Sequence, residues 1–209
     1  MTPLRSLLFI PGDSEKKLGK VDNCGADAVI LDLEDSVSSV NKPLARELVA
    51  AFLAERPPGK RNAQLWVRIN PLDSGLFADD LDMIISGAPD GIMLPKAEGP
   101  DDVRALSDQL DKLEGSISII PVATETAIAP FRLGDYATAN LPRLAGLTWG
   151  AEDLSAALGA STNVDANGEW AFTYKLVRSL TLMAARAAGV QAIDTLFVDF
   201  RNEAGLLAA

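Results

Sequence analysis

The sequence of 209 residues predicts an α/β fold built from alternating strands and helices, a TIM-type (β/α)8 barrel that lacks its eighth strand. Most strand-length apolar runs are continuous, which is typical of parallel strands buried on both faces. Runs that start near residues 65, 91, 118 and 145 recur at an interval that fits one strand plus one helix. No internal repeat and no Pro- or Ser-rich linker interrupts the pattern, so residues 1–209 form one expected domain.

Seven strands are expected, and helical patterns separate them. The expected strands are residues 6–11, 28–33, 65–69, 91–94, 117–124, 145–149 and 195–198. Capping residues at Asp13-Ser14 and the later Gly25 bound the first helix, and Asn41 followed by Pro43 begins the second, which runs to Pro57. Further helices are expected over 77–85, 101–113 and 172–188, short broken helices over 127–139, and a polar loop of lid length over 161–169.

A closed (β/α)8 barrel needs an eighth strand, and residues 202–209 (NEAGLLAA) read only as the start of a seventh helix. We therefore expect a barrel truncated at its C-terminus. A doubly wound open sheet is the alternative architecture. The first strand–turn, FIPGDS, has no GxGxxG phosphate fingerprint, which argues against a dinucleotide-binding sheet.

Composition excludes several classes of function. A net charge of −10 without clustered basic residues argues against nucleic acid as a partner. The complete absence of histidine removes Ser-His-Asp triads and the usual zinc sites. No apolar run reaches the ~18 residues that a membrane span needs. A single cysteine, Cys24, precludes an internal disulfide and fits a reducing cytoplasm, with a small apolar role favoured over a nucleophilic one.

Three polar residues follow apolar runs at positions where parallel strands converge, namely Arg68, Glu125 and Asp153. Two carboxylates side by side repel each other unless a cation lies between them. Mg²⁺ commonly takes one or two protein carboxylates and leaves its other positions to water and substrate, so Glu125 and Asp153 are candidate magnesium ligands. Helix capping or ion pairing is the open alternative for both.

Arg68 has a planar fork that suits a carboxylate or phosphate, although pairing with Asp32 or Glu34 is an equal alternative. The acids Asp32, Glu34 and Asp35 crowd the end of the second expected strand and require cationic company. The candidates are Arg5, Lys42, Arg46 and Lys96. For Lys96, which also ends a strand, a charge partner is favoured over a Schiff base.

Six motifs in a fixed order give the sequence a specific resemblance. The sequence resembles the citrate lyase beta-subunit-like group of the HpcH/HpaI aldolase/citrate lyase superfamily over essentially all of its length. The motifs are RSLLFIPG from Arg5, AVILDLEDSV from Ala28 with Lys42 and Arg46, VRIN from Val67, LPK from Leu94, Glu125-Thr126, and GAEDL from Gly150.

The resemblance implies a TIM barrel that makes or breaks a carbon–carbon bond in a 3-hydroxy-carboxyacyl thioester of the malyl-, citramalyl- or citryl-CoA type. It implies that Glu125 and Asp153 hold Mg²⁺, with Glu125 also at the substrate. It further implies that Arg68 binds the ketoacid carboxylate as the catalytic residue, and that Arg5 lies on the thioester side of the pocket. A Mg²⁺ ion there would act as Lewis acid and template, and Arg5 is the expected donor to the thioester oxygen.

Two rival functions stay open. A metal-dependent pyruvate aldolase of the same superfamily would use a histidine, which this sequence lacks. A non-catalytic barrel subunit is the other rival. Relatives continue into an eighth strand and a C-terminal segment thought to lend an acid to the neighbouring subunit. Its absence here leaves the acid–base residue unassigned, so we expect ligand binding but weak bond cleavage. The open strand edges and the resemblance favour a homo-oligomer, with a trimer preferred.

Overall fold

The computed structural model describes residues 3–112, 116–199 and 201–208. Five parallel strands form one sheet in chain order, and two more parallel strands form a second. The strands of the first sheet are β1 (Leu7–Pro11), β2 (Ala28–Asp32), β3 (Gln64–Arg68), β4 (Gly91–Leu94) and β5 (Ser118–Pro121). The second sheet pairs β6 (Gly146–Leu147) with β7 (Gln191–Ala192).

Backbone contacts join the two sheets, so the strand succession continues past β5. Ile119 and Leu144 form one parallel bridge, and Val122 and Thr148 form another. The resulting order of parallel strands is that of a TIM-type barrel, as the sequence predicts, but the barrel is not closed. Within the described part of the chain no strand lies between β7 and β1. The side-chain amide of Gln191 instead spans the opening and bonds both backbone groups of Leu4.

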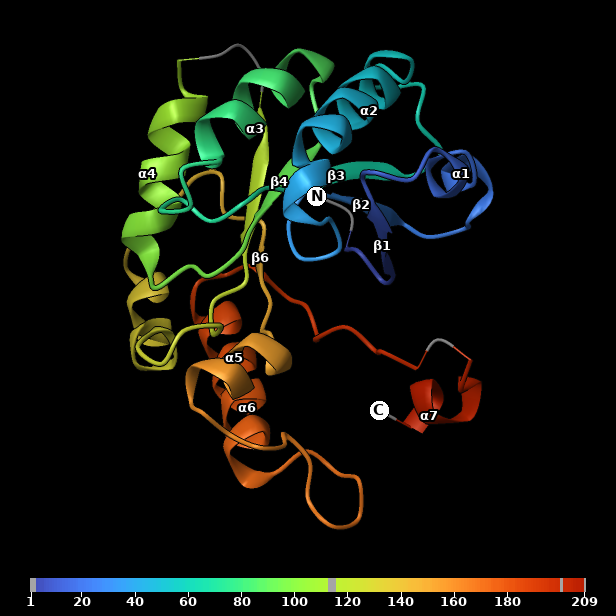
Figure 1. The fold of residues 1–209 in the computed structure, drawn as a ribbon. Helices are drawn as coiled ribbons and strands as arrows, with labels where there is room; N and C mark the ends of the chain where they lie inside the picture. The colour runs from blue at the N-terminus through green and yellow to red at the C-terminus, as the bar shows by residue number, and fades with distance from the viewer. Residues whose placement is uncertain (1–2, 113–115, 200, 209) are drawn as a thin grey trace.

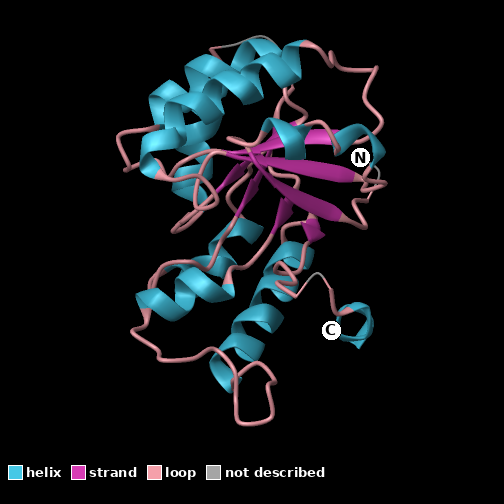
Figure 2. Cartoon of the chain, turned by 45° about the vertical axis from the view of Figure 1, so that its right-hand side comes forward, coloured by secondary structure: helices cyan, strands magenta, loops and turns pink. Residues whose placement is uncertain are grey.

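Helices follow most of the strands and cover the outside of the sheet (Figures 1 and 2). Those near the first five strands are α1 (Glu15–Leu18), α2 (Lys42–Ala54), α3 (Phe77–Ile84) and α4 (Pro100–Leu110). Short 3₁₀ helices are η1 (Val21–Asn23), η2 (Ser39–Asn41), η3 (Ile85–Gly87) and η4 (Ala129–Ala137). The later helices are α5 (Ala151–Ala157), α6 (Phe172–Ala187) and α7 (Glu203–Ala208), and α7 stands apart from the sheet in both views. No described helix is long and apolar enough to cross a bilayer.

Alternation along each strand divides the core into two layers. Val29, Leu31 and Val67 belong to the outer layer, which packs against the helices. Ile30 and Trp66 belong to the inner layer with Met93 and Ile120. The inner layer fills the space directly below the carboxyl ends of β2 and β3. The residues that end those strands therefore lie directly above apolar side chains.

Gly91 is needed for that inner layer. A Cβ at residue 91 would lie 2.2 Å from the ring of Trp66, a separation that no side chain tolerates. Trp66 is fully buried and its indole N–H donates to the Gln64 side chain at 2.9 Å. A glycine at the start of β4 therefore makes room for the largest side chain inside the barrel.

Several element predictions need correction. The seventh strand is Gln191–Ala192 and not residues 195–198, because the chain pairs with β6 directly after α6: Gln191 and Ile193 donate backbone N–H groups to Ala145 and Leu147. Leu196 and Val198 of the expected strand are exposed instead. Within residues 127–139, Ala129–Ala137 form one 3₁₀ helix, η4, in place of short separate helices. The expected helix 101–113 ends at Leu110, and its last predicted residue, Leu113, lies outside the described residues.

Candidate active site

A carboxylate and a guanidinium lie side by side at the carboxyl ends of β2 and β3. Asp32 ends β2, Arg68 ends β3, and the two residues are partners in the parallel register. The Arg68 guanidinium donates from Nε to Asp32 Oδ1 and from Nη2 to Asp32 Oδ2, both at 2.7 Å. This is the two-bond geometry that distinguishes arginine from lysine. Burial raises the pKa of Asp32, but the hydrogen bond and charge of Arg68 outweigh burial and hold that pKa below its ordinary value.

The same guanidinium reaches a second acid and an aromatic ring. Arg68 Nη1 lies 3.0 Å from Glu34 Oε2, and its guanidinium carbon stands 4.9 Å from the centre of the Phe9 ring. Phe9 is the middle residue of β1, so Arg68 contacts residues from both β1 and β2 as well as ending β3. The pairing with Asp32 and Glu34 is the structural alternative that the sequence left open. Only 12% of the Arg68 side chain is exposed.

Lys96 follows β4 and extends toward the acids after β2. Its Nζ lies 2.5 Å from Glu34 Oε1, 3.7 Å from Asp35 Oδ2 and 3.6 Å from Asp153 Oδ1. Burial lowers the pKa of Lys96, but the hydrogen bond and charge of Glu34 outweigh burial and hold the pKa above its ordinary value. Lys96 is therefore a charged partner of carboxylates, as favoured from the sequence, and lacks the neutral amine that Schiff-base formation requires.

Among the carboxylates around Lys96, Glu125 is the most deeply buried one without a cationic side chain bonded to it. It follows β5 and is 5% exposed. Its Oε2 accepts the backbone N–H of Lys96 at 2.7 Å, and its Oε1 accepts no hydrogen bond from the residues that the structure describes. Burial raises the pKa of Glu125 to about 8; the Lys96 N–H opposes that rise, and the negative charges of Asp153 and Glu34 add to it.

Asp153 faces Glu125 from the first turn of α5. That helix begins after Gly150, whose backbone is extended at φ −120° and ψ 117°. A Cβ at residue 150 would lie 2.7 Å from Glu125 Oε1, so the backbone can approach the carboxylate this closely only because residue 150 is glycine. No side-chain hydrogen bond caps this helix at Gly150. The ion-pair alternative raised for Asp153 is met, because Lys96 Nζ lies 3.6 Å from its Oδ1.

These features fit a hard divalent cation. Glu125 is a buried residue whose Oε1 accepts no hydrogen bond from the described residues, and Asp153 supplies a second charge that acts on it. No cluster of three or more Asp, Glu, His or Cys side chains with metal-site geometry occurs within residues 3–112, 116–199 and 201–208. A pair of carboxylates is sufficient for Mg²⁺, which keeps several positions for water and substrate. The residues that would hold the ion are Glu125 and Asp153.

Arg5 lies away from this group. It precedes β1, so it belongs to the amino ends of the strands, whereas Asp32 and Arg68 end theirs. Its side chain is 85% exposed and pairs with Asp27, from Nη2 to Oδ1 at 2.7 Å. The structure therefore separates Arg5 from Arg68, Glu125 and Asp153. A strand of five residues spans roughly 16 Å, which Arg5 cannot bridge.

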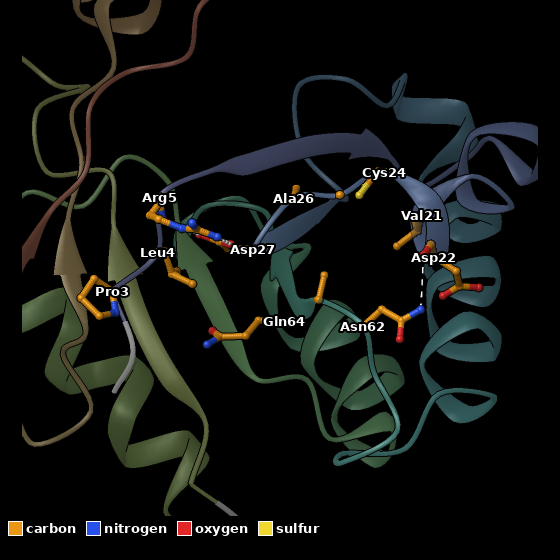
Figure 3. Close-up of a pocket in the computed structure, with 12 residues that line it drawn as sticks. Pro3, Leu4, Arg5, Val21, Asp22, Cys24, Ala26, Asp27, Asn62 and Gln64 are labelled. Carbon is orange, nitrogen blue, oxygen red and sulfur yellow. Dashed lines mark hydrogen bonds and ion pairs between the residues drawn. The ribbon is translucent and has the colours of Figure 1, made fainter.

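A cavity of about 630 Å³ lies at the amino ends of β1, β2 and β3, and Arg5 lines it (Figure 3). Cys24, the partly exposed single cysteine, lines it as well. The inner apolar layer separates this cavity from the group around Glu125. This cavity thus lies apart from the edge where the charged strand ends meet.

Supporting residues escaped the sequence analysis. Asp80 of α3 is fully buried and accepts the N–H and the side-chain amide of Asn70, both at 2.7 Å, and Arg46 Nε at 2.6 Å. Arg46 is therefore not a partner of the acids after β2, as the sequence had suggested it could be. Lys42 donates to the backbone oxygens of Leu33 and Glu34 at 2.7 and 2.8 Å. The sequence signal for this buried cluster is the pair Asp79-Asp80 in the first turn of a helix. Acids are common at that place because they interact favourably with the helix dipole, so the pair does not stand out.

Comparison with known proteins gives one consistent family. The HpcH/HpaI aldolase/citrate lyase model matches residues 5–209. Mitochondrial citramalyl-CoA lyase of Mus musculus is 34% identical, aligned over 98% of this chain and 63% of its own length. Citrate lyase subunit beta of Escherichia coli K12 is also 34% identical, over 97% of this chain and 67% of its own. The chain thus spans less than two thirds of the length of the mouse relative.

Solved structures agree with this assignment. The CitE protein of Mycobacterium tuberculosis, in complex with magnesium and acetoacetate, is 32% identical, with a TM-score of 0.82 over 100% of this chain and 81% of that chain. Citrate lyase beta subunit of the same organism, complexed with oxaloacetate and magnesium, is 34% identical with a TM-score of 0.79, over 97% of this chain and 82% of that chain. With fold, strand-end residues and family model in agreement, the chain belongs to the HpcH/HpaI aldolase/citrate lyase family.

Proposed function

We propose that this chain is the barrel of a Mg²⁺-dependent acyl-CoA lyase that cleaves or forms a carbon–carbon bond in a 3-hydroxy-carboxyacyl thioester. The observation that carries the proposal is the buried Glu125, on which the charge of Asp153 acts, at the same strand-end edge as Arg68. Relatives named citramalyl-CoA lyase and citrate lyase subunit beta, and related structures with magnesium and ketoacids, support the same reaction.

In the cleavage direction the hydroxyl proton of the substrate leaves, the bond between the carbinol carbon and the acyl α-carbon breaks, and a ketoacid forms. The acyl α-carbon takes up a proton, which gives the shorter acyl-CoA. When bound, Mg²⁺ supplies Lewis-acid polarisation of substrate oxygen. Arg68 has the fork to neutralise the ketoacid carboxylate, and Asp32 fixes the plane of that fork through two parallel bonds.

Arg5 has no part in this proposal because it lies at the other end of the strands. The donor to the thioester oxygen and the general acid–base residue are therefore unassigned in this chain. A pyruvate aldolase remains disfavoured by the absence of histidine. A non-catalytic role is disfavoured because Arg68, Glu125 and Asp153 all stand at one edge of the barrel.

The deciding experiment is a product analysis with malyl-, citramalyl- and citryl-CoA in the presence and absence of Mg²⁺. Lyase activity releases a ketoacid and an acyl-CoA without free thiol. A relative at 32% identity is named (3S)-malyl-CoA thioesterase, and a thioesterase would instead release free CoA thiol and a hydroxydiacid. Protein that binds neither Mn²⁺ nor oxaloacetate would contradict both the lyase and the thioesterase function and would favour a non-catalytic barrel.

Assembly is a second part of the proposal. We propose a homo-oligomer, with a trimer favoured by the family resemblance. Support comes from the β1 and β7 edges, which no strand covers within the described residues, and from exposed Leu182 and Met183 on α6. The lone cysteine supports a reducing, cytoplasmic location. Sedimentation of the purified chain that shows a stable monomer would contradict the assembly proposal.

A further inference from the structure

Lys96 has a backbone conformation that lysine rarely adopts. Its φ is +52°, in the left-handed region, and it follows Pro95 at the end of β4. Such a conformation is strained for a residue other than glycine and persists only where the surroundings enforce it. Here it turns the backbone N–H onto Glu125 Oε2 at 2.7 Å while the side chain runs to Glu34. One residue thus contacts the candidate metal ligand and a neighbouring acid from its two ends.

Glu34 is held by a cation on each of its carboxylate oxygens. Lys96 Nζ lies 2.5 Å from Oε1 and Arg68 Nη1 lies 3.0 Å from Oε2. The side chain is only 4% exposed, so water cannot take over either role. Oε2 accepts no hydrogen bond in the described part of the chain, so Arg68 holds it by charge alone. Both oxygens of Glu34 therefore face a cation as long as Lys96 and Arg68 remain in place.

Glu34 is nevertheless close to the candidate metal ligands. The ammonium that holds it also lies 3.6 Å from Asp153 Oδ1, and the charge of Glu34 acts on Glu125. Without the ammonium, only Arg68 would hold Glu34, and its Oε1 would be free to turn toward the same ion. A third carboxylate would bind the ion more tightly and would fill a position that a substrate oxygen needs.

We propose that Lys96 is a positioning residue that keeps Glu34 away from the metal, so that only Glu125 and Asp153 bind it and substrate oxygens find open positions. The inference rests on the proposed function, since it concerns the same metal. In this role the Lys96 ammonium neither forms a Schiff base nor serves only as a surface ion pair. The contact between Lys96 and Glu34 then has two effects: it weakens metal binding, and it strengthens substrate binding.

The test is Lys96→Met, which keeps side-chain length and removes the charge. With Mn²⁺ as the probe, we expect the Kd for Mn²⁺ to fall tenfold or more, measured by electron paramagnetic resonance titration. Water-proton relaxation should report fewer water molecules on the bound Mn²⁺. The affinity of the Mn²⁺-loaded protein for oxaloacetate should fall tenfold or more. A merely structural role for Lys96 would weaken both affinities together.

Second variants make the result decisive. Lys96→Met combined with Glu34→Gln removes the competing carboxylate and should restore the wild-type number of bound water molecules. Lys96→Arg keeps the positive charge and should behave as wild type. Lys112→Met is the matched control, because Lys112 is an exposed lysine whose ammonium donates to Gln109 within the described residues. It should change none of these values.

The single variant Glu34→Gln tests the inference even if Lys96→Met does not fold. Since Glu34 is not a ligand in this proposal, its Kd for Mn²⁺ should stay within twofold of wild type. A tenfold loss of affinity would make Glu34 a metal ligand and overturn the inference. Weaker Mn²⁺ binding by folded Lys96→Met would overturn it as well. Wild-type protein that binds no Mn²⁺ would instead contradict the proposed function itself.

Discussion

Arg68 holds neighbouring strands together with the same guanidinium that we propose binds the substrate carboxylate. Its Nε and Nη2 are committed to Asp32, its Nη1 faces Glu34, and its plane stands over Phe9. A ligand carboxylate at this edge would meet a fork whose orientation is already fixed. Pre-organisation of this kind lowers the entropic cost of binding an anionic substrate.

Replacing Arg68 by lysine tests that fixed orientation. Arg68→Lys keeps the charge but loses the two parallel bonds to Asp32, so we expect kcat/KM for the thioester to fall by roughly 10–100-fold, the worth of one or two charged hydrogen bonds. Steady-state kinetics provide the measurement. The exposed Arg104→Lys serves as control, since Arg104 pairs at the surface with Asp101. An unchanged kcat/KM in Arg68→Lys would remove Arg68 from the site.

Glu125 makes the stability of the metal-free protein depend on pH. Its pKa is raised from 4.5 to about 8 in the folded protein, mainly by burial. Between these values the folded state binds a proton that the unfolded state releases, so stability decreases as pH rises through this window. Each pKa unit corresponds to about 1.4 kcal/mol. Glu125→Gln should remove this part of the slope, seen as a smaller difference in the free energy of unfolding between pH 5 and pH 8.5.

At the scale of elements, the start of α5 determines how closely backbone and carboxylate approach. Gly150→Ala adds a Cβ that would meet Glu125 Oε1 at 2.7 Å, while its extended backbone suits alanine. We therefore expect little change in Tm but about a 10–100-fold loss of Mn²⁺ affinity, as for other residues that orient a ligand. Calorimetric titration measures it. Gly134→Ala is the matched control, since a Cβ there meets no atom within 4 Å.

The elements that sequence predicted best are those with continuous apolar runs. Residues 91–94 match β4 at both ends, and the starts of β2 and α2 agree with their predictions. The seventh strand was misplaced because Gln191 is polar, although its amide serves to bond Leu4. In contrast, the Leu196 and Val198 positions look like a strand but are exposed. Pairing partners decide such short segments, and composition cannot reveal them.

The site was predictable as far as strand ends converge. Arg68, Glu125 and Asp153 could be placed at one edge because each follows a buried run. Arg5 was expected in the same pocket, but it precedes its strand. The rule that strand-end residues converge therefore assigns Arg5 to the opposite edge of the sheet. The left-handed turn at Lys96 and the close approach of Gly150 depend on backbone geometry, which residue types alone do not encode.

For the whole molecule, Gln191 joins the first and last strands. Its Oε1 accepts the Leu4 N–H at 2.9 Å and its Nε2 donates to the Leu4 oxygen at 2.5 Å. Gln191→Ala should lower the free energy of unfolding by about 1–3 kcal/mol, because two groups on the largely buried Leu4 lose their partner. Urea denaturation measures it. Gln191→Glu keeps the acceptor but not the donor and should be intermediate in effect; equal stability of all three would contradict the role.

The filled interior of the barrel also determines how molecules travel. Trp66, Ile30 and Met93 fill the space beneath Asp32 and Arg68, so the cavity at the amino ends and the charged edge lie on opposite sides of an apolar layer. A molecule that binds at that edge therefore approaches from the carboxyl ends of the strands or from the side that stays open between β7 and β1 in the described part of the chain. For a reaction that splits one molecule into two, the products then need not leave by the same route.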